Sequence, residues 1–197
     1  MSKSDPASSQ KERNKAIRWV ITIFLVTIVI SSVITLVSDE IMSRSGMFTA
    51  FVILLVIILI GILFDIIGVA VTSADETPFH SMAARKVPGA QESIRLLRNA
   101  SKVGSICNDV IGDVCGVVSG SASATIAALI ISRVDMGWPR IITLAMSALV
   151  AGATVGGKAL GKGFAMSSAT VIVHTVGRLI YWLQHFPKLF GKKKNKR

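Results

Sequence analysis

Two long apolar stretches constrain this chain more than any other feature. Residues 17–37 read IRWVITIFLVTIVISSVITLV, and residues 47–71 read MFTAFVILLVIILIGILFDIIGVAV. A helix needs about 20 predominantly apolar residues to cross a bilayer, and both stretches reach that length. The chain is 51% apolar and only 17% charged, with a mean hydropathy of +0.62. The sequence therefore predicts an all-α, polytopic membrane protein.

Two weaker stretches complete a prediction of about four transmembrane helices. They cover about residues 103–131 and 141–157 and are rich in small residues. A following stretch, MSSATVIVHTVGRLIYWL, could be a fifth span, but His174 and Arg178 favour an amphipathic surface helix over about residues 164–184. A cleaved signal peptide is the competing interpretation of the first apolar stretch. Its apolar core is too long for that role, and no small-residue cleavage site follows it.

Positive charge is concentrated in three polar segments. The formal net charge is +11. Lys and Arg number five in residues 1–18, five in residues 72–102 and six in residues 188–197, against three in the linkers 38–46 and 132–140 together. This positive-inside pattern predicts a multi-pass protein of the cell membrane with both termini in the cytoplasm. The tail KKKNKR is interpreted as a topology anchor that touches anionic lipid, and no nucleic-acid binding is expected.

The expected organisation is one domain between two polar ends. A cytoplasmic basic tail covers residues 1–16, the transmembrane domain covers residues 17–184, and a basic C-terminal tail covers residues 185–197. Within the polar segment after the second span, apolar and basic residues alternate over residues 90–99 in a pattern typical of a short juxtamembrane helix.

Three carboxylates lie inside the apolar stretches: Asp65, Asp109 and Asp113. An ionised carboxylate near the bilayer centre costs at least ~2.5 kcal/mol on insertion scales, which points to a functional role. Asp109 and Asp113 are four residues apart and share one helical face, with Ser105 one turn away and Asn108 beside them. These oxygen donors suit a hard cation such as Mg²⁺ or Na⁺. The five residues are the candidate metal ligands.

Other interpretations of the acids stay open. Asp113 could pair with Lys158 or Lys162, and Asp109 could lie near a membrane surface. The chain has no GxxxxGK[ST], HExxH, CxxC or GxSxG motif, and its three histidines are scattered. An enzyme is therefore not expected.

Small residues recur every four positions in the third and fourth stretches. Gly112, Gly116 and Gly120 form two overlapping GxxxG units, and Gly152/Gly156 and Gly157/Gly161 form two more. Such spacing lets helix backbones approach closely, which predicts helix packing at these positions. The contact could lie within one chain or across a homodimer.

Two further motifs carry a resemblance to a known family. Residues 82–105 read MAARKVPGAQESIRLLRNASKVGS, and residues 178–183 read RLIYWL. They resemble the basic juxtamembrane segment and the surface helix of the CNNM/CorC (CorB) family of magnesium transporters. The resemblance covers about residues 58–183. It implies a magnesium-binding transmembrane domain, with Asn108 or Asp109 where a family asparagine helps to bind the ion.

The chain also departs from the family pattern. Where the family has GExxPK, residues 152–157 read GATVGG, without the acid or the proline. Asp65 stands where a serine ligand is expected, and residues 17–37 add a span. The cytosolic CBS-pair module of the family is expected to be absent.

These observations lead to two functional hypotheses. The first is membrane transport or binding of a hard divalent cation, Mg²⁺ above all, with Na⁺ as a candidate coupling ion. The second is a non-transporting scaffold or subunit that docks a partner through its glycine-rich helix faces. A homodimer is expected in either case, and a separate regulatory subunit is a further candidate partner.

Overall fold

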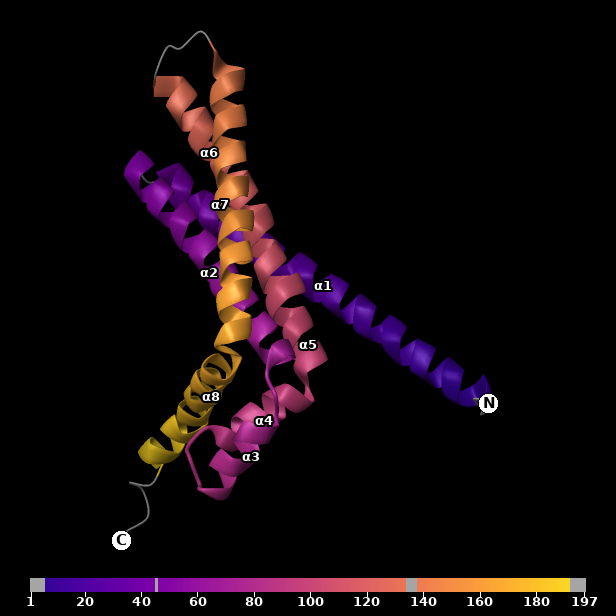
Figure 1. The fold of residues 1–197 in the computed structure, drawn as a ribbon. Coiled ribbons are helices and arrows are strands. Elements are labelled where there is room, and N and C mark those ends of the chain that lie inside the picture. Colours follow the sequence, from indigo (N-terminus) through magenta and orange to yellow (C-terminus); the bar gives the residue numbers. More distant parts are fainter. Residues whose placement is uncertain (1–5, 45, 134–137, 192–197) are drawn as a thin grey trace.

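The fold consists of helices joined by short connections (Figure 1). A computed structural model of the chain describes residues 6–44, 46–133 and 138–191. No strand occurs among these residues. The prediction of an all-α fold is confirmed.

Four helical segments are long and apolar enough to cross a membrane: Arg13–Met42, Met47–Ser73, Ala100–Arg133 and Pro139–Ser167. The first two spans lie in α1 (Pro6–Arg44) and α2 (Met47–Ser73). The third span is a continuous run of three elements: α5 (Ala100–Gly104), η1 (Ser105–Gly112) and α6 (Asp113–Arg133). The fourth span is α7 (Pro139–Ser167). The prediction of about four transmembrane helices is confirmed, and the chain is membrane-embedded.

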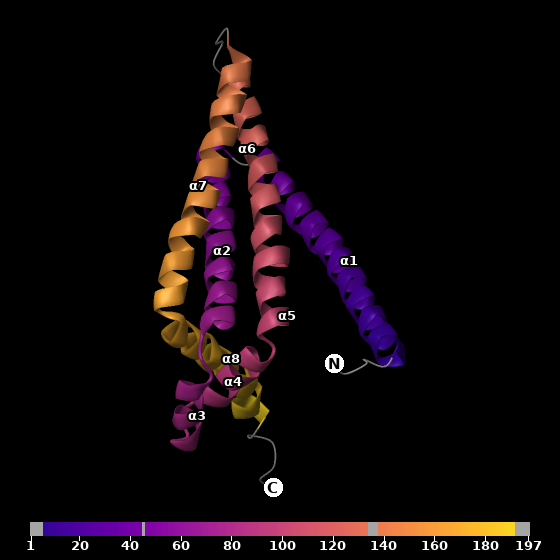
Figure 2. The same cartoon turned by 45° about the vertical axis from the view of Figure 1, so that its right-hand side comes forward.

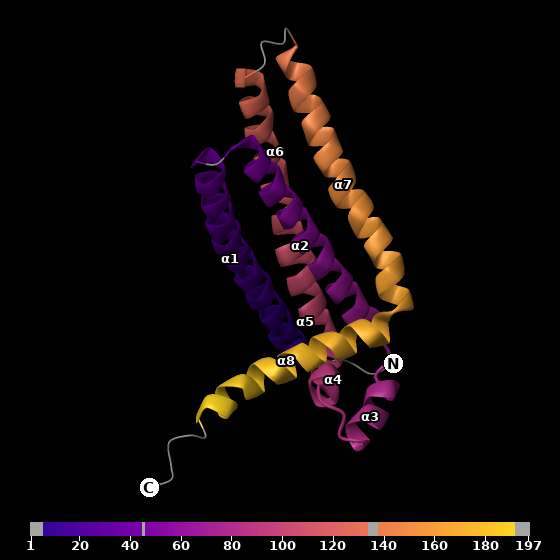
Figure 3. The same ribbon diagram turned by 90° about the vertical axis from the view of Figure 1, so that its left-hand side faces the viewer.

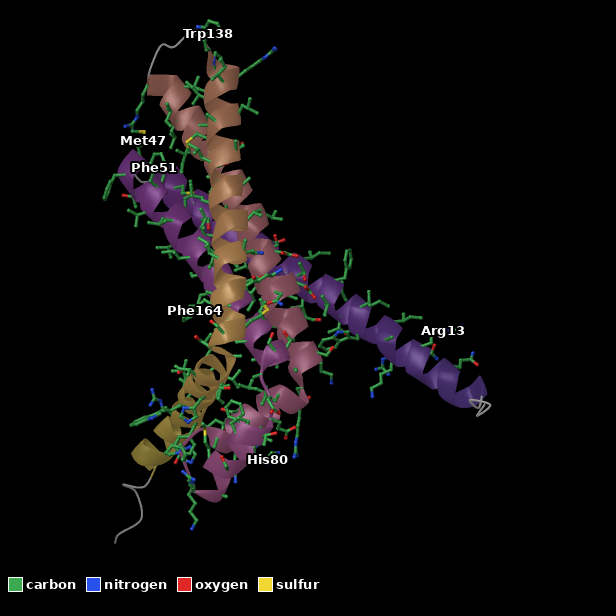
Figure 4. The ribbon with its side chains drawn as sticks, viewed as in Figure 1. Arg13, Met47, Phe51, His80, Trp138 and Phe164 are labelled. Atoms are coloured by element: carbon green, nitrogen blue, oxygen red, sulfur yellow. The ribbon has the colours of Figure 1, made fainter. Side chains whose placement is uncertain are left out.

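The bundle has two ends of different character. At one, which we call the loop end, α1 meets α2 and α6 meets α7, and Trp138 lies there (Figure 4). At the other, which we call the terminal end, α1 begins and α3 (Thr77–Ala84), α4 (Ala90–Arg98) and α8 (Ala169–Gly191) lie. His80 of α3 marks this end in Figure 4.

Helices α2, α6 and α7 form the packed centre of the bundle. Toward the loop end, Leu54 and Ile58 of α2 pack with Ala122 and Ile126 of α6 and with Val150 of α7. Large apolar side chains also cover the outside of these helices, where they face lipid rather than water. Since lipid is as apolar as these side chains, close packing rather than the hydrophobic effect holds the helices together.

Helix α1 packs against the bundle mainly through its second half. Ile30 and Ile34 pack against a buried cluster of α2 and α6, and Met42 is buried near the loop end. From there α1 leans away from α5 toward the terminal end (Figure 2). Its first turns are therefore exposed, with Val20 and Phe24 each more than 60% accessible.

The third span is not a uniform α-helix. Its segment η1, with the sequence SICNDVIG, is a π-helix between two α-helical parts. A π-helix bonds each residue to the fifth one along and is found most often as a short insertion at functional sites. The sequence pattern predicts a single α-helix through residues 103–131, so this local change of register is a finding of the structure.

Helix α8 lies across the terminal end of the bundle (Figure 3) and does not span it. α8 is not among the described helices that are long and apolar enough to cross a membrane, and its assignment to the membrane surface stays a prediction. α8 begins at Ala169 rather than near residue 164, because α7 continues to Ser167. The predicted fourth span ended at residue 157 because Lys158 follows, but a lysine does not end a helix. The tail 192–197 lies outside the described residues.

Helices α4 and α8 cross with their backbones in close approach. The hydroxyl of Ser93 donates to the carbonyl oxygens of Gly89 at 2.9 Å and of Val173 at 3.2 Å. A Cβ on Gly177 would meet the carbonyl oxygen of Gly89 at 2.6 Å. Gly89 itself has φ +87°, a conformation that favours glycine. Small residues on both helices therefore set the crossing.

We expect Gly177→Ala to loosen this crossing. The added methyl group would overlap backbone and the Ser93 hydroxyl, and such overpacking costs roughly 1–3 kcal/mol. Thermal unfolding in detergent micelles measures the loss. The matched control is Gly163→Ala on α7, where an added Cβ meets no atom within 4 Å. That control should be neutral or stabilising by up to about 1 kcal/mol. Equal effects of the two substitutions would contradict this account of the crossing.

Candidate functional site

Polar side chains from three helical segments meet inside the membrane-spanning part of the bundle. Asp65 comes from α2, Asn108 from η1, Asp113 from the first turn of α6 and Lys158 from α7. We call these four residues the polar cluster. Gly112, the last residue of η1, lies among them.

Asp65 is the most enclosed member of the polar cluster. It is 5% exposed, and its Oδ2 atom is buried without a hydrogen-bond partner in the described part of the chain. Two glycines of α2, Gly61 and Gly68, let the third span pack closely beside Asp65. A Cβ on Gly61 would lie 2.8 Å from the Cβ of Cys115, and Gly68 is covered by Asn108. The backbones are therefore close on both sides of the carboxylate.

Asn108 lies directly on the backbone of α2. A Cβ on Gly68 would overlap its side-chain amide, with 2.7 Å to the amide carbon. Its Oδ1 atom is buried and, among the described residues, lacks a hydrogen-bond partner. Asp65 and Asn108 thus present two buried oxygen acceptors from facing elements. Such atoms are costly when left unsatisfied, all the more in a membrane.

Lys158 supplies positive charge to the polar cluster. Its Nζ donates to Asp113 Oδ1 at 3.2 Å. The same Nζ lies 3.4 Å from the point where a Gly112 Cβ would be, and Asp65 Oδ1 lies 3.8 Å from that point. One ammonium group therefore lies near two carboxylates, in a space left open because residue 112 has no side chain.

The structure separates the five candidate ligands. Asp65, Asn108 and Asp113 belong to the polar cluster, whereas Asp109 is exposed and Ser105 is half-buried, and within the described residues neither side chain is hydrogen-bonded to the cluster. In the part of the chain that is described, no group of three or more His, Cys, Asp or Glu side chains is close enough to hold a metal ion. The shared face of Asp109 and Asp113 is the exposed face of the helix, and Asp65 lies behind it.

Lys158 is the member of the polar cluster that the sequence analysis did not include among the candidate site residues. The pairing of Asp113 with Lys158 was one of the open interpretations of the sequence, and the structure contains that pair. Its proximity to Asp65 was not predicted. A basic residue within a membrane-spanning stretch is the signal that indicates such a role, and Lys162 one turn further on carries the same signal.

The glycines also divide into two groups. Gly112 faces the polar cluster, but an added Cβ at Gly116, Gly120, Gly152 or Gly156 would meet no atom within 4 Å. Close approach of α7 to α2 uses the GxxxG unit Gly157/Gly161, which lies against Ile62 and Ile66. The positions Gly116, Gly120, Gly152 and Gly156 are open within one chain, and their role between chains stays a prediction.

Comparison of the chain with protein-family models, with curated proteins and with solved structures finds no match. The resemblance to the CNNM/CorC family therefore rests on the two motifs alone and stays a prediction. In the fold, the first motif runs from α3 through α5 and the second lies in α8.

We expect substitutions in the polar cluster to change stability with opposite signs. Asp65→Leu removes an unpartnered buried carboxylate and should raise the free energy of unfolding in micelles by about 1–3 kcal/mol. Lys158→Met leaves Asp113 without its ion-pair partner and removes the ammonium group that lies beside Gly112. It should lower the free energy of unfolding by about 1–3 kcal/mol, between the values for surface and buried pairs.

The control for the lysine is Lys162→Met, one turn further along α7. Lys162 is exposed and makes no ion pair within the described residues, so this change should be nearly neutral. If Asp65→Leu is less stable than the parent protein, or if Lys158→Met and Lys162→Met lower the free energy of unfolding equally, the roles described for Asp65 and Lys158 are wrong.

Proposed function

We propose that this protein binds a hard cation within the membrane at the polar cluster and carries it across the bilayer. Mg²⁺ is the first candidate, and Na⁺ is the candidate coupling ion. One observation carries the proposal. Asp65 Oδ2 and Asn108 Oδ1 are buried in facing helical segments, and in the described part of the chain neither has a hydrogen-bond partner. Both atoms accept only, so a cation or a donor must complete them.

The chemistry of these donors supports a partly hydrated ion. Mg²⁺ is commonly held by one or two carboxylates and keeps several of its waters. Asp65 would supply the carboxylate and Asn108 the amide oxygen, both in the spanning part of the bundle. A dehydrated ion would need a closed cage, and the described residues offer no such group of acids.

Charge balance assigns a second role to Lys158. With both carboxylates ionised, Asp65, Asp113 and Lys158 sum to one negative charge. A Na⁺ ion would neutralise that charge with the Lys158–Asp113 pair intact. A Mg²⁺ ion would bring one positive charge more than neutrality requires. In a low-dielectric site, repulsion from the ion would drive the Lys158 ammonium away. Lys158 would then compete with Mg²⁺ for the same carboxylates.

The position of charged residues supports an orientation for this transport. Basic residues concentrate at the terminal end, in α4, in the first turns of α1 and at Arg85. The positive-inside rule then places the terminal end in the cytoplasm and the loop end outside, in a cell membrane.

Titration of the purified protein with Mg²⁺ in micelles tests the proposal. Asp65→Asn should weaken Mg²⁺ binding at least about tenfold, because the only buried carboxylate of the cluster loses its charge. Lys158→Met should strengthen it, because the competing ammonium is gone. Flux of Mg²⁺ into proteoliposomes, followed with an enclosed indicator dye, should fall in Asp65→Asn in parallel with binding.

Asp39→Asn is the matched control, because it removes one negative charge from an exposed position on α1 outside the polar cluster. It should leave affinity and flux unchanged. Asp109→Asn tests whether Asp109, a candidate ligand outside the polar cluster, takes part in binding. It should change Mg²⁺ affinity and flux little. If Asp65→Asn and Lys158→Met both bind Mg²⁺ like the parent protein, the cation assignment is wrong.

The open glycine rows favour a second candidate function, that of a scaffold whose α6 and α7 faces dock another helix. Gly116 and Gly152 lie on these faces with free space before them. Under this function Gly116→Leu should abolish assembly with a second copy or a partner, read as the mass of the complex in micelles. The cluster variants should assemble normally. Gly163→Leu, also on an open position of α7 but outside the rows, is the control.

A further inference from the structure

A basic cavity lies at the terminal end, between α1 and the junction of α4 with α5. Its volume is about 580 Å³. Among the described residues, four cationic side chains and no acidic one line it: Lys15, Arg18, Arg98 and Lys102. Trp19 contributes an aromatic side chain to the lining. The cavity thus combines concentrated positive charge with an aromatic wall.

The positive charge of this cavity is largely uncompensated. Arg98 Nε is bonded to Glu76 Oε1 at 3.1 Å, outside the cavity lining. Lys15, Arg18 and Lys102 have no carboxylate partner within the described residues. Lys102 Nζ lies 5.6 Å from the centroid of the Trp19 ring, a cation–π contact that joins α5 to α1. Three like charges gathered in one cavity call for an anion.

The position of the cavity fits the interface between lipid and water. It lies where the apolar stretch of α1 begins, and Trp19 is typical of the head-group level of a membrane. Ile17 and Val20 beside it are exposed and face the surrounding lipid. α1 leans away from α5 toward this end of the bundle (Figure 2).

We propose that this cavity binds the phosphate group of an anionic membrane lipid. Lys15, Arg18 and Lys102 hold the phosphate, and Arg98 lies at the rim. The acyl chains lie along the exposed apolar face of α1. The bound lipid fills the space between the first turns of α1 and α5 and holds the two spans together. The inference is independent of cation transport, because none of these residues belongs to the polar cluster.

The chemistry of the cavity recognises a phosphate anion, which a lipid or soluble phosphate could supply. Trp19 gives a direct optical readout. A protein with Trp138→Phe and Trp182→Phe keeps Trp19 as its one remaining tryptophan out of three, and both replaced residues are exposed. Bromine atoms near the top of the acyl chains quench tryptophan fluorescence on contact. Brominated phosphatidylglycerol and brominated phosphatidylcholine in neutral micelles are the two probes.

We expect phosphatidylglycerol to quench Trp19 at a concentration at least about fivefold lower than phosphatidylcholine. Each basic residue near an anionic head group contributes a factor of about five to binding. Arg18→Gln with Lys102→Gln should therefore reduce the preference by up to about 25-fold, leaving the contribution of Lys15. Lys15→Gln alone, at an exposed position without an ion pair in the described chain, should reduce it about fivefold.

The matched control is Arg85→Gln with Arg178→Gln, two exposed basic residues of the terminal end that do not line the cavity. It should keep the full preference. Equal quenching by the two lipids in the parent protein, or the same loss in the control, would overturn the proposal. If inorganic phosphate at millimolar concentration removes the preference, the cavity is a site for soluble phosphate and the lipid assignment fails.

Discussion

Every polar group inside a lipid bilayer must find its partner within the protein, and the centre of this bundle is organised around that requirement. Asp65 enters the membrane as a carboxylate on α2 and is almost fully enclosed. The nearest positive charge, Lys158, is already bonded to Asp113. Gly112 leaves the space in which these groups converge. The buried oxygen of Asp65 is left without a partner among the described residues, which is an energetic cost unless another positive species enters.

The overall architecture could be predicted from sequence because membrane physics leaves few choices. The two strongest apolar stretches had to be spanning helices, and a segment carrying His174 and Arg178 was better placed on the surface than across the bilayer. Helix ends were harder to predict. Apolar windows stop at a charged residue such as Lys158, whereas hydrogen bonding carries α7 on to Ser167. Which face of α1 packs, and where it leaves the bundle, has no signature in its uniformly apolar sequence.

The site was predictable in its residue types but not in its geometry. A carboxylate in a span is a reliable signal, and it identified Asp65. An α-helical register placed Asp109 and Asp113 on one face but did not show that this face is exposed. Likewise, GxxxG spacing singled out Gly157 and Gly161, which pack against α2, but equally Gly116 and Gly152, which are open within one chain, and it missed Gly61. Spacing along one helix does not identify the opposing surface.

The π-helix fixes how the two halves of the third span are turned relative to each other. It contains one more residue than an α-helical turn needs, so α5 is rotated relative to α6 by roughly 100°, the angle that one residue occupies in an α-helix. Deleting a single residue between Ser105 and Gly112 would let the segment close into regular α-helix. The span would then keep its apolar length but turn Asn108 off the backbone of α2. The inward position of that amide therefore depends on chain length at this point as much as on the identity of the residue.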